Sequence, residues 1–245
     1  MCIRDSMRDS LKTSKIETHG FSLIELMVVI AVIAILATIL IPAIGKVRTN
    51  ALRSESVSNL RQIYAACGLY SNDNNLKLVN SFIAANDELN REQSGWWFQL
   101  VDGDYLGGPD KKGFRHPRYY SVLGSPIQRR EVPDITKDRK PNPVMVTYGM
   151  NTVLSMIREN EISSISANAL IAPGRTLFIS EGHLSSGGNW FSLGVSPWGM
   201  APNNTDGIIT FAYADGSIGQ LPVEEFPTTQ GPRGSDSWYF WRGKE

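Results

Sequence analysis

The sequence has few of the residues on which most enzyme active sites depend. Three of its 245 residues are histidine and two are cysteine. It contains no nucleophile elbow, phosphate-binding loop, paired-cysteine zinc motif or HExxH helix. Glu181 and His183 could suggest acid–base chemistry, but a lone glutamate and histidine beside a strand end usually form a surface turn. Because a catalytic constellation is missing, we expect a protein that is not an enzyme and that needs no cofactor.

An excess of charge is missing as well. The chain has 24 Lys and Arg residues against 24 Asp and Glu residues, so its formal net charge is zero. No overall field therefore attracts it to nucleic acid or to an anionic membrane surface.

Cysteine is too scarce for a disulfide framework. Residues 1–6 resemble the translated end of a sequencing adapter, and we interpret them as an artefact, with Met7 either the true start or a chance internal methionine. Cys2 then has no biological role, and Cys67 remains as a single cysteine. A single cysteine cannot form an internal disulfide, so we expect the domain to fold without one.

The sequence does contain one long apolar run. It covers residues 21–44, directly after Gly20, and its only charged residue is Glu25. At about 1.5 Å per residue, a helix of this length can cross a hydrocarbon core of roughly 30 Å. A carboxylate inside lipid costs on the order of 2.5–3.5 kcal/mol unless it is paired. Glu25 is therefore expected to have a function.

Two simpler interpretations of the apolar run fit less well. A secretory signal peptide has a shorter apolar core, and a small-residue cleavage site follows that core. Here Gly20 precedes the run instead. A plain membrane anchor would have no use for Glu25, because carboxylates within membrane spans are usually functional.

The stretch Gly-Phe-Ser-Leu-Ile-Glu-Leu at residues 20–26 resembles the N-terminus of type IV prepilins and type II secretion pseudopilins. The resemblance implies that a prepilin peptidase cuts between Gly20 and Phe21 and then methylates the new amino group of Phe21. It also implies that Glu25 pairs with the amino terminus of a neighbouring subunit and sets the register, since opposite charges attract strongly in a dry filament core. Pro42 removes one helical hydrogen bond and is expected to kink or locally open the helix.

The resemblance also implies a function and a location. The chain would be a structural subunit of a type II secretion pseudopilus or a type IV pilus. Its partners would be other subunits, the peptidase, an inner-membrane assembly platform and the ATPase of that platform. Residues 1–20 would be a cytoplasmic leader, and everything after the span at 21–44 would lie outside the bacterial inner membrane. This orientation comes from the resemblance, because basic residues flank both sides of the span.

The helix is predicted to continue beyond the membrane over residues 45–72. Apolar residues recur there at spacings of three and four, which is typical of an amphipathic helix. They are Val57, Leu60, Ile63, Tyr64, Cys67 and Tyr70. Asn and Asp residues at 72–75 favour turns and should end the helix. We therefore predict a pilin-like α+β fold: a long N-terminal helix packed on a small antiparallel β-sheet, with residues 73–245 forming a head with long loops.

Short strands are the expected elements of the head. They are predicted at residues 144–148, 175–180, 207–213 and 217–221. Residues 214–216, Ala-Asp-Gly, should form a tight hairpin turn. Residues 150–160 are predicted as a short helix and residues 182–204 as a long loop. The C-terminal aromatic residues are expected to pack against the head rather than form an exposed partner patch; these are Trp238, Tyr239, Phe240 and Trp241.

The head also resembles the pilin-like proteins common in planctomycetes and verrucomicrobia. The shared features are a helix that ends in Tyr-x-Asn-Asp-Asn at 70–74, the Trp-rich segment 96–98, Tyr-Gly-x-Asn at 148–151, and a late Asp215-Gly216 pair. Two positions depart from the group. His116 precedes Pro117 where the group often has a cysteine, and Thr205 stands where it often has a histidine. Roles that depend on that cysteine or histidine are not carried over.

A calcium site is one further hypothesis. Major pseudopilins hold calcium in loops near their C-terminal strands, and this chain has oxygen-bearing side chains in about the same region. Calcium takes six to eight such oxygens. The candidates are Asp206 and Asp215, with Asn203 and Asn204. Turn geometry alone is the alternative explanation for both Asp-Gly pairs.

DNA binding, or binding of another surface ligand, by a minor pilin is the alternative function. Basic residues cluster near aromatic ones between residues 111 and 140, where such a loop could follow phosphates and stack bases. The candidates are Arg115, Arg118, Arg129 and Arg130. A solvated loop is the preferred interpretation, because acidic residues are mixed with the basic ones.

Overall fold

The structure is a computed structural model of the chain. It describes residues 22–81, 96–108, 120–127, 147–154, 157–158, 161–162, 165–181, 194–195, 207–227, 229 and 231–243. The chain divides into two compact units, Met1–Lys46 and Val47–Glu245, and each is described by itself.

Helix α1 spans Leu23–Asp73 and contains the apolar run. Within the first unit its large apolar side chains are exposed; Leu23 is 72% and Ile41 is 70% exposed. By length and composition, α1 is the one helix among the described residues that could cross a membrane. The helix continues through Pro42, so this proline does not end it, and the predicted kink stays a prediction.

The part of α1 in the second unit, residues 47–73, has an apolar face that packs into the core. Leu60 and Ile63 are fully buried and Cys67 is almost fully buried, as the spacing predicted. Burial of each large aliphatic side chain contributes roughly 1.5–3 kcal/mol. Burial also raises the pKa of the Cys67 thiol, so this cysteine stays protonated and is a core residue rather than a reactive one.

The head contains a five-stranded sheet in the order β5-β1-β4-β6-β7. Its strands are β1 (Tyr148–Asn151), β4 (Leu177–Glu181), β5 (Gly194–Val195), β6 (Ile208–Tyr213) and β7 (Ile218–Pro222). Strands β1, β4, β6 and β7 pair antiparallel, whereas β5 pairs parallel with β1. Strands β2 (Ile157–Arg158) and β3 (Glu161–Ile162) form a separate two-stranded sheet. The predicted α+β fold with a small antiparallel sheet is confirmed.

The predicted turn between the last two strands is confirmed. The N–H of Gly216 donates to the carbonyl of Tyr213 at 3.0 Å, and the N–H of Tyr213 donates to the carbonyl of Ser217 at 2.8 Å. Gly216 has φ of 86°, a conformation that glycine adopts without steric cost. These contacts make a three-residue hairpin loop, the next most common type after two-residue loops.

The helix predicted over residues 150–160 is wrong. Met150 and Asn151 end β1, a 3₁₀ turn covers Thr152–Leu154, and β2 follows. The cause is Asn151, whose buried side chain accepts the N–H of Val153 at 3.0 Å. Asparagine in this role offers the backbone an alternative to the helical pattern.

Two predicted boundaries also change. The strand predicted at 144–148 begins instead at Tyr148, and residues 144–146 lie outside the described part. The loop predicted over 182–204 contains the two residues of β5; the rest of it is not described.

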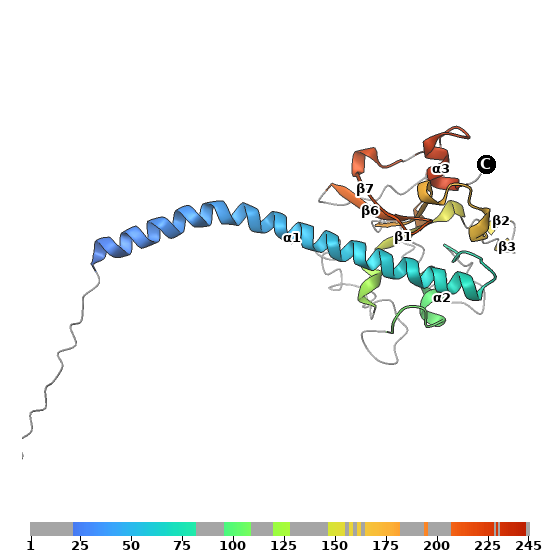
Figure 1. Ribbon diagram of the computed structural model, residues 1–245, viewed down its shortest axis with the longest axis horizontal. Helices are drawn as coiled ribbons and strands as arrows, with labels where there is room; N and C mark the ends of the chain where they lie inside the picture. The colour runs from blue at the N-terminus through green and yellow to red at the C-terminus, as the bar shows by residue number, and fades with distance from the viewer. Residues whose placement is uncertain are drawn as a thin grey trace, which may run out of the picture. The chain divides into compact units, whose positions relative to one another are not determined.

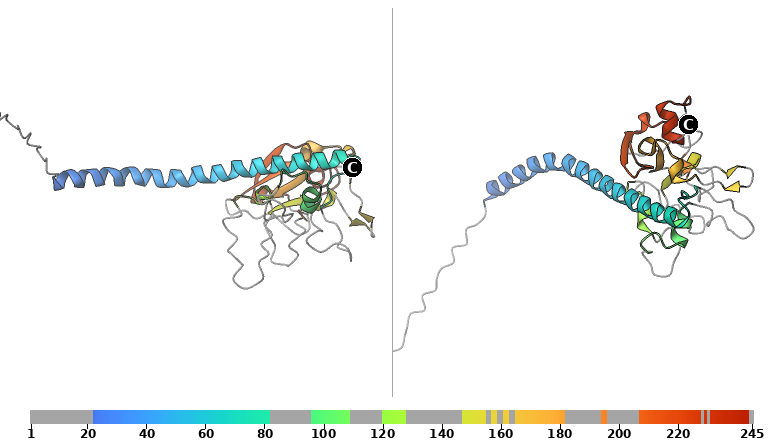
Figure 2. Two further views of the ribbon diagram at one scale, coloured as in Figure 1. Left: turned by 90° about the horizontal axis from the view of Figure 1, so that it is seen from below. Right: turned by 45° about the vertical axis from the view of Figure 1, so that its right-hand side comes forward.

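One core cluster joins the head part of α1 to the sheet and to helix α2 (Trp96–Asp102). Figures 1 and 2 show this part of α1 lying beside the sheet. Trp96, Trp97 and Leu100 of α2 are buried there together with Leu60 and Ile63 of α1. The Trp-rich segment is therefore the packing partner of the amphipathic helix.

A second cluster confirms the packing role of two of the four C-terminal aromatic residues, Phe240 and Trp241, whereas Trp238 and Tyr239 are half-buried. Phe240 and Trp241 of helix α3 (Asp236–Arg242) are buried against Phe211 and Phe226. The ring of Phe240 meets those of Phe211 and Phe226 edge-on, with centroids 5.8 and 5.3 Å apart. This edge-to-face geometry adds about 0.5–1.5 kcal/mol per pair to the burial of the rings.

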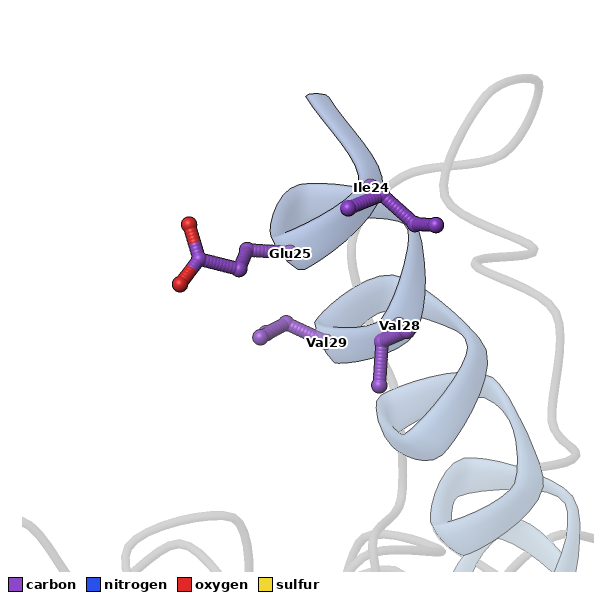
Figure 3. A pocket seen from close by; sticks show the side chains of 4 residues that line it. All are labelled: Ile24, Glu25, Val28 and Val29. Carbon is purple, nitrogen blue, oxygen red and sulfur yellow. The ribbon is translucent and has the colours of Figure 1, made fainter. Parts of the chain in front are cut away.

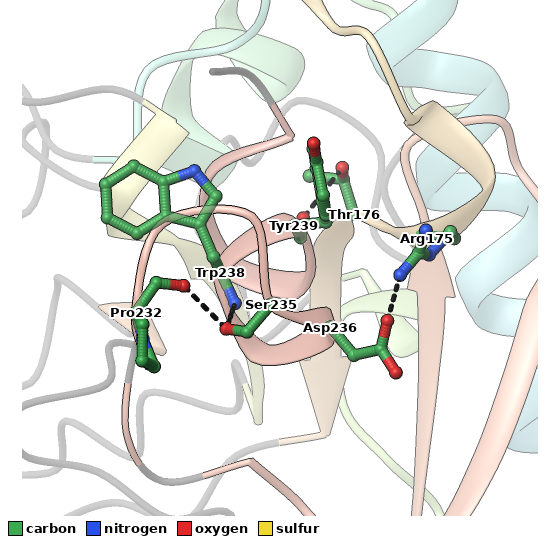
Figure 4. A network of polar contacts seen from close by, with 7 residues as sticks. All are labelled: Arg175, Thr176, Pro232, Ser235, Asp236, Trp238 and Tyr239. Atoms are coloured by element: carbon green, nitrogen blue, oxygen red, sulfur yellow. Dashed lines mark hydrogen bonds and ion pairs between the residues drawn. The ribbon is translucent and has the colours of Figure 1, made fainter.

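Polar contacts fix both ends of α3 (Figure 4). Ser235 caps the helix, because its Oγ accepts the N–H of Trp238 at 3.2 Å. Asp236 forms an ion pair with Arg175, and the hydroxyl of Thr176 donates to the carbonyl of Tyr239 at 3.0 Å. An N-cap of this kind stabilises a helix by about 1 kcal/mol. The C-terminal segment is thus attached to the two residues that precede β4.

Candidate functional site

The first site residue, Glu25, lies in the first turn of α1. The carbonyl of Ser22 accepts the backbone N–H groups of Glu25 and Leu26 at 3.0 and 3.2 Å. The carboxylate of Glu25 bends back, and its Oε2 accepts the backbone N–H of Ser22 at 3.0 Å. This is the glutamate half of a capping box. The spacing Ser-x-x-Glu is the signal for it, and sequence reasoning overlooked that signal.

Glu25 is the single charge in an apolar setting (Figure 3). It lines a shallow surface hollow together with Ile24, Val28 and Val29. Its carboxylate points away from the helix axis. The positive end of the helix dipole and the N–H of Ser22 both stabilise a negative charge at this position. The arrangement offers an anionic contact at the end of an otherwise apolar helix surface.

The predicted processing residues cannot be placed beside Glu25. Gly20 and Phe21 lie outside the described residues, so the cleavage site and the methylated amino group stay predictions from the sequence. Pro42 lies inside α1.

A second polar site, around Glu181, was missed by sequence reasoning. The expectation of a surface turn is wrong for this residue, which ends β4 and is 0% exposed; His183 is outside the described residues. Ser56 and Ser125 donate their hydroxyls to Oε1 of Glu181, the latter at 2.8 Å. The backbone N–H of Thr210 donates to Oε2 at 3.0 Å.

These contacts connect segments that are far apart in the chain. Ser56 belongs to α1, Thr210 to β6 and Ser125 to the segment 120–127. Tyr148 of β1 joins through its hydroxyl, 2.9 Å from the Oγ of Ser56. A buried carboxylate is tolerated only when hydrogen bonds replace the water that it loses. The Glu181 network therefore anchors α1 to the sheet, and its chemistry is that of a structural polar core.

The structure describes one of the four candidate calcium ligands. Asn203, Asn204 and Asp206 lie outside the described residues. Asp215 lies in the exposed hairpin turn, where Ser217 donates its N–H and its hydroxyl to Oδ1 at 2.9 and 2.6 Å. These bonds lower the pKa of Asp215. Within the described part of the chain, no group of three or more His, Cys, Asp or Glu side chains could hold a metal ion. Calcium binding stays a prediction.

The DNA-binding candidates lie outside the described residues as well. Arg115 and Arg118 fall between 109 and 119, and Arg129 and Arg130 fall between 128 and 146. DNA binding as an alternative function stays a prediction.

Comparison with known proteins identifies the N-terminal region. Residues 18–41 match the prokaryotic N-terminal methylation motif. The chain is also 49% identical over 48 residues to the type IV major pilin protein PilA of Myxococcus xanthus, and the match covers 20% of this chain and 22% of that protein. No solved structure matches the chain.

Proposed function

We propose, from the premise that residues 18–41 are the N-terminal region of a type IV prepilin or pseudopilin, that the chain is a structural filament subunit. It is inserted in the inner membrane by the apolar part of α1, with the leader in the cytoplasm and the head outside. A prepilin peptidase cuts it between Gly20 and Phe21 and methylates Phe21. An assembly platform and its ATPase then transfer it into a type IV pilus or a type II secretion pseudopilus. The methylation motif with Glu25 at the start of α1 is the observation that carries the proposal.

The exposed apolar surface of α1 supports the proposal. Contiguous apolar surface of this extent is not stable in water and marks a membrane or protein contact. A lipid bilayer and the core of a helical filament both cover such a surface. The two environments correspond to the states of the subunit before and after assembly.

Glu25 distinguishes the filament subunit from a permanent membrane anchor. In lipid its charge is penalised by on the order of 2.5–3.5 kcal/mol. Pairing with the amino group of a neighbouring Phe21 offsets that penalty, because the attraction is strong where water is excluded. The carboxylate thus favours the assembled state over the inserted one, which a plain anchor would not require.

The head fits a structural role. Two of its buried polar residues, Glu181 and Asn151, are engaged in hydrogen bonds that connect α1, the sheet and α3. Buried hydrogen-bond networks of this kind rigidify a domain. A rigid head attached to an extractable helix is what a filament subunit needs.

A shearing experiment tests the proposal. The full-length chain with a C-terminal tag is expressed in a bacterium that has a functional type IV pilus or type II pseudopilus machine. We expect tagged chain in the sheared filament fraction, and we expect it to disappear from that fraction when the assembly ATPase is deleted. Chain that stays in the inner membrane in both hosts, while their own subunits assemble, would contradict the proposal.

A further inference from the structure

We propose that Ser22 is a positioning residue, whose backbone N–H holds the Glu25 carboxylate in the membrane-inserted chain and aims it at the neighbouring subunit. The inference rests on the proposed function, in which Glu25 contacts the amino terminus of that neighbour.

The geometry is a closed turn made by the chain itself. The N–H of Ser22 donates to Oε2 of Glu25 at 3.0 Å, and the carbonyl of Ser22 accepts the N–H of Glu25 at 3.0 Å. The two residues therefore exchange hydrogen bonds in both directions. The bond to the carboxylate comes from the backbone, so every residue type except proline can supply it at position 22.

This bond lowers two energetic costs of membrane insertion, that of an unpaired backbone N–H and that of an unpaired carboxylate. The first N–H groups of a helix have no partner inside the helix, and lipid contains no water that could accept from them. A carboxylate in lipid likewise lacks donors. The Ser22 bond satisfies one group of each kind, and it is a charge-assisted bond, about twice as strong as a neutral one. Glu25 thus enters the membrane with a partner from its own chain.

The same bond leaves the carboxylate able to contact a second chain. An ionised carboxylate has about four lone-pair sites, and the Ser22 N–H uses one of them. Figure 3 shows the carboxylate directed outward from the first turn of α1, beside Val29. A side chain held in this way loses little further freedom when the neighbour arrives, which favours binding. Without the bond, the carboxylate can turn toward the headgroups, as other charged side chains near helix ends do.

Two substitutions at position 22 distinguish the contribution of the backbone N–H from that of the serine side chain. Ser22→Ala keeps the backbone N–H, whereas Ser22→Pro removes it, and proline is tolerated before and within a first helical turn. Each tagged variant competes with the wild-type chain for incorporation into sheared filaments, and Glu25→Ala sets the lower limit. We expect Ser22→Ala to incorporate within about twofold of wild type and Ser22→Pro to fall by roughly tenfold or more, the size of one hydrogen bond to a charged group.

The outcomes separate this inference from the proposed function. Equal incorporation of Ser22→Pro and Ser22→Ala, with Glu25→Ala excluded, would overturn the positioning role and leave the filament subunit intact. Failure of the wild-type chain to incorporate would overturn both. A second measurement is independent of peptidase cleavage: hydrogen exchange of the Ser22 amide in the full-length chain in detergent micelles. We expect exchange at least tenfold slower in wild type than in Glu25→Ala, and equal rates would overturn the inference.

Discussion

A chain with Glu25→Ala is expected to insert in the membrane and fold its head normally, yet to be almost absent from filaments. Removal of the carboxylate eases insertion, since a charge in lipid costs on the order of 2.5–3.5 kcal/mol. It also removes the one anionic side chain in the apolar run, which we propose specifies the register of neighbouring subunits. A subunit without it competes poorly for each position in the filament. The measurement is the ratio of variant to wild-type chain in sheared filaments after equal expression.

A matched control tests whether the loss of incorporation is specific to Glu25 or follows the removal of any glutamate. Glu224 is exposed in the head, and Glu224→Ala should enter filaments at the wild-type ratio. Near-ultraviolet circular dichroism from the buried tryptophans should be unchanged in both variants, because neither touches the head core. Normal incorporation of Glu25→Ala would show that another contact sets the register.

A chain with Glu181→Gln is expected to lose a large part of the stability of its head. An amide has the shape of a carboxylate but presents one acceptor and one donor. Oε1 of Glu181 accepts the hydroxyls of Ser56 and Ser125, and Oε2 accepts the N–H of Thr210. The N–H of Thr210 can only donate, so the amide oxygen must face it, and the hydroxyls of Ser56 and Ser125 must turn to accept from the NH₂ group. Three bonds to a charged group then become neutral bonds, each worth about 1 kcal/mol less, so the free energy of unfolding should fall by about 2–3 kcal/mol.

Thermal unfolding of the full-length chain in detergent measures this cost. For a domain of this size, 1 kcal/mol corresponds to roughly 2–4 °C in Tm, so the Tm of the head should fall by about 4–12 °C. Glu224→Gln is the matched control and should leave Tm unchanged, because Glu224 is exposed. An unchanged Tm for Glu181→Gln would mean that the network does not anchor α1 to the sheet.

Local patterns in the sequence predicted the helix and the hairpin well. The apolar face of α1 over residues 47–73 repeats every three or four residues, and such a face favours packing against an apolar core. The turn at Asp215-Gly216 depends on a positive φ that glycine supplies. Both features are encoded within a few residues, so they could be predicted before any tertiary contact was known.

The Glu181 network could not be predicted in the same way. Its donors are remote in sequence: Ser56 is 125 residues away and Ser125 is 56 residues away from Glu181. A glutamate that follows a strand is ordinarily exposed, and only the pairing of β4 with β6 and the packing of α1 bury this one. The helix predicted over residues 150–160 was wrong for a related reason. The side chain of Asn151 donates to the carbonyls of Leu177 and Trp241, which are remote in sequence. By contrast, the Ser22–Glu25 cap was local and could have been predicted from its spacing.

The mass of the mature N-terminus tests the central claim most directly. The full-length chain is co-expressed with a prepilin peptidase, purified from membranes and analysed by mass spectrometry, with a variant that has a bulky residue in place of Gly20 as the control. The account predicts a wild-type chain that begins at N-methylated Phe21, and a control variant that keeps its leader. A wild-type chain with an intact leader, or one cut after Ile44, would contradict the account.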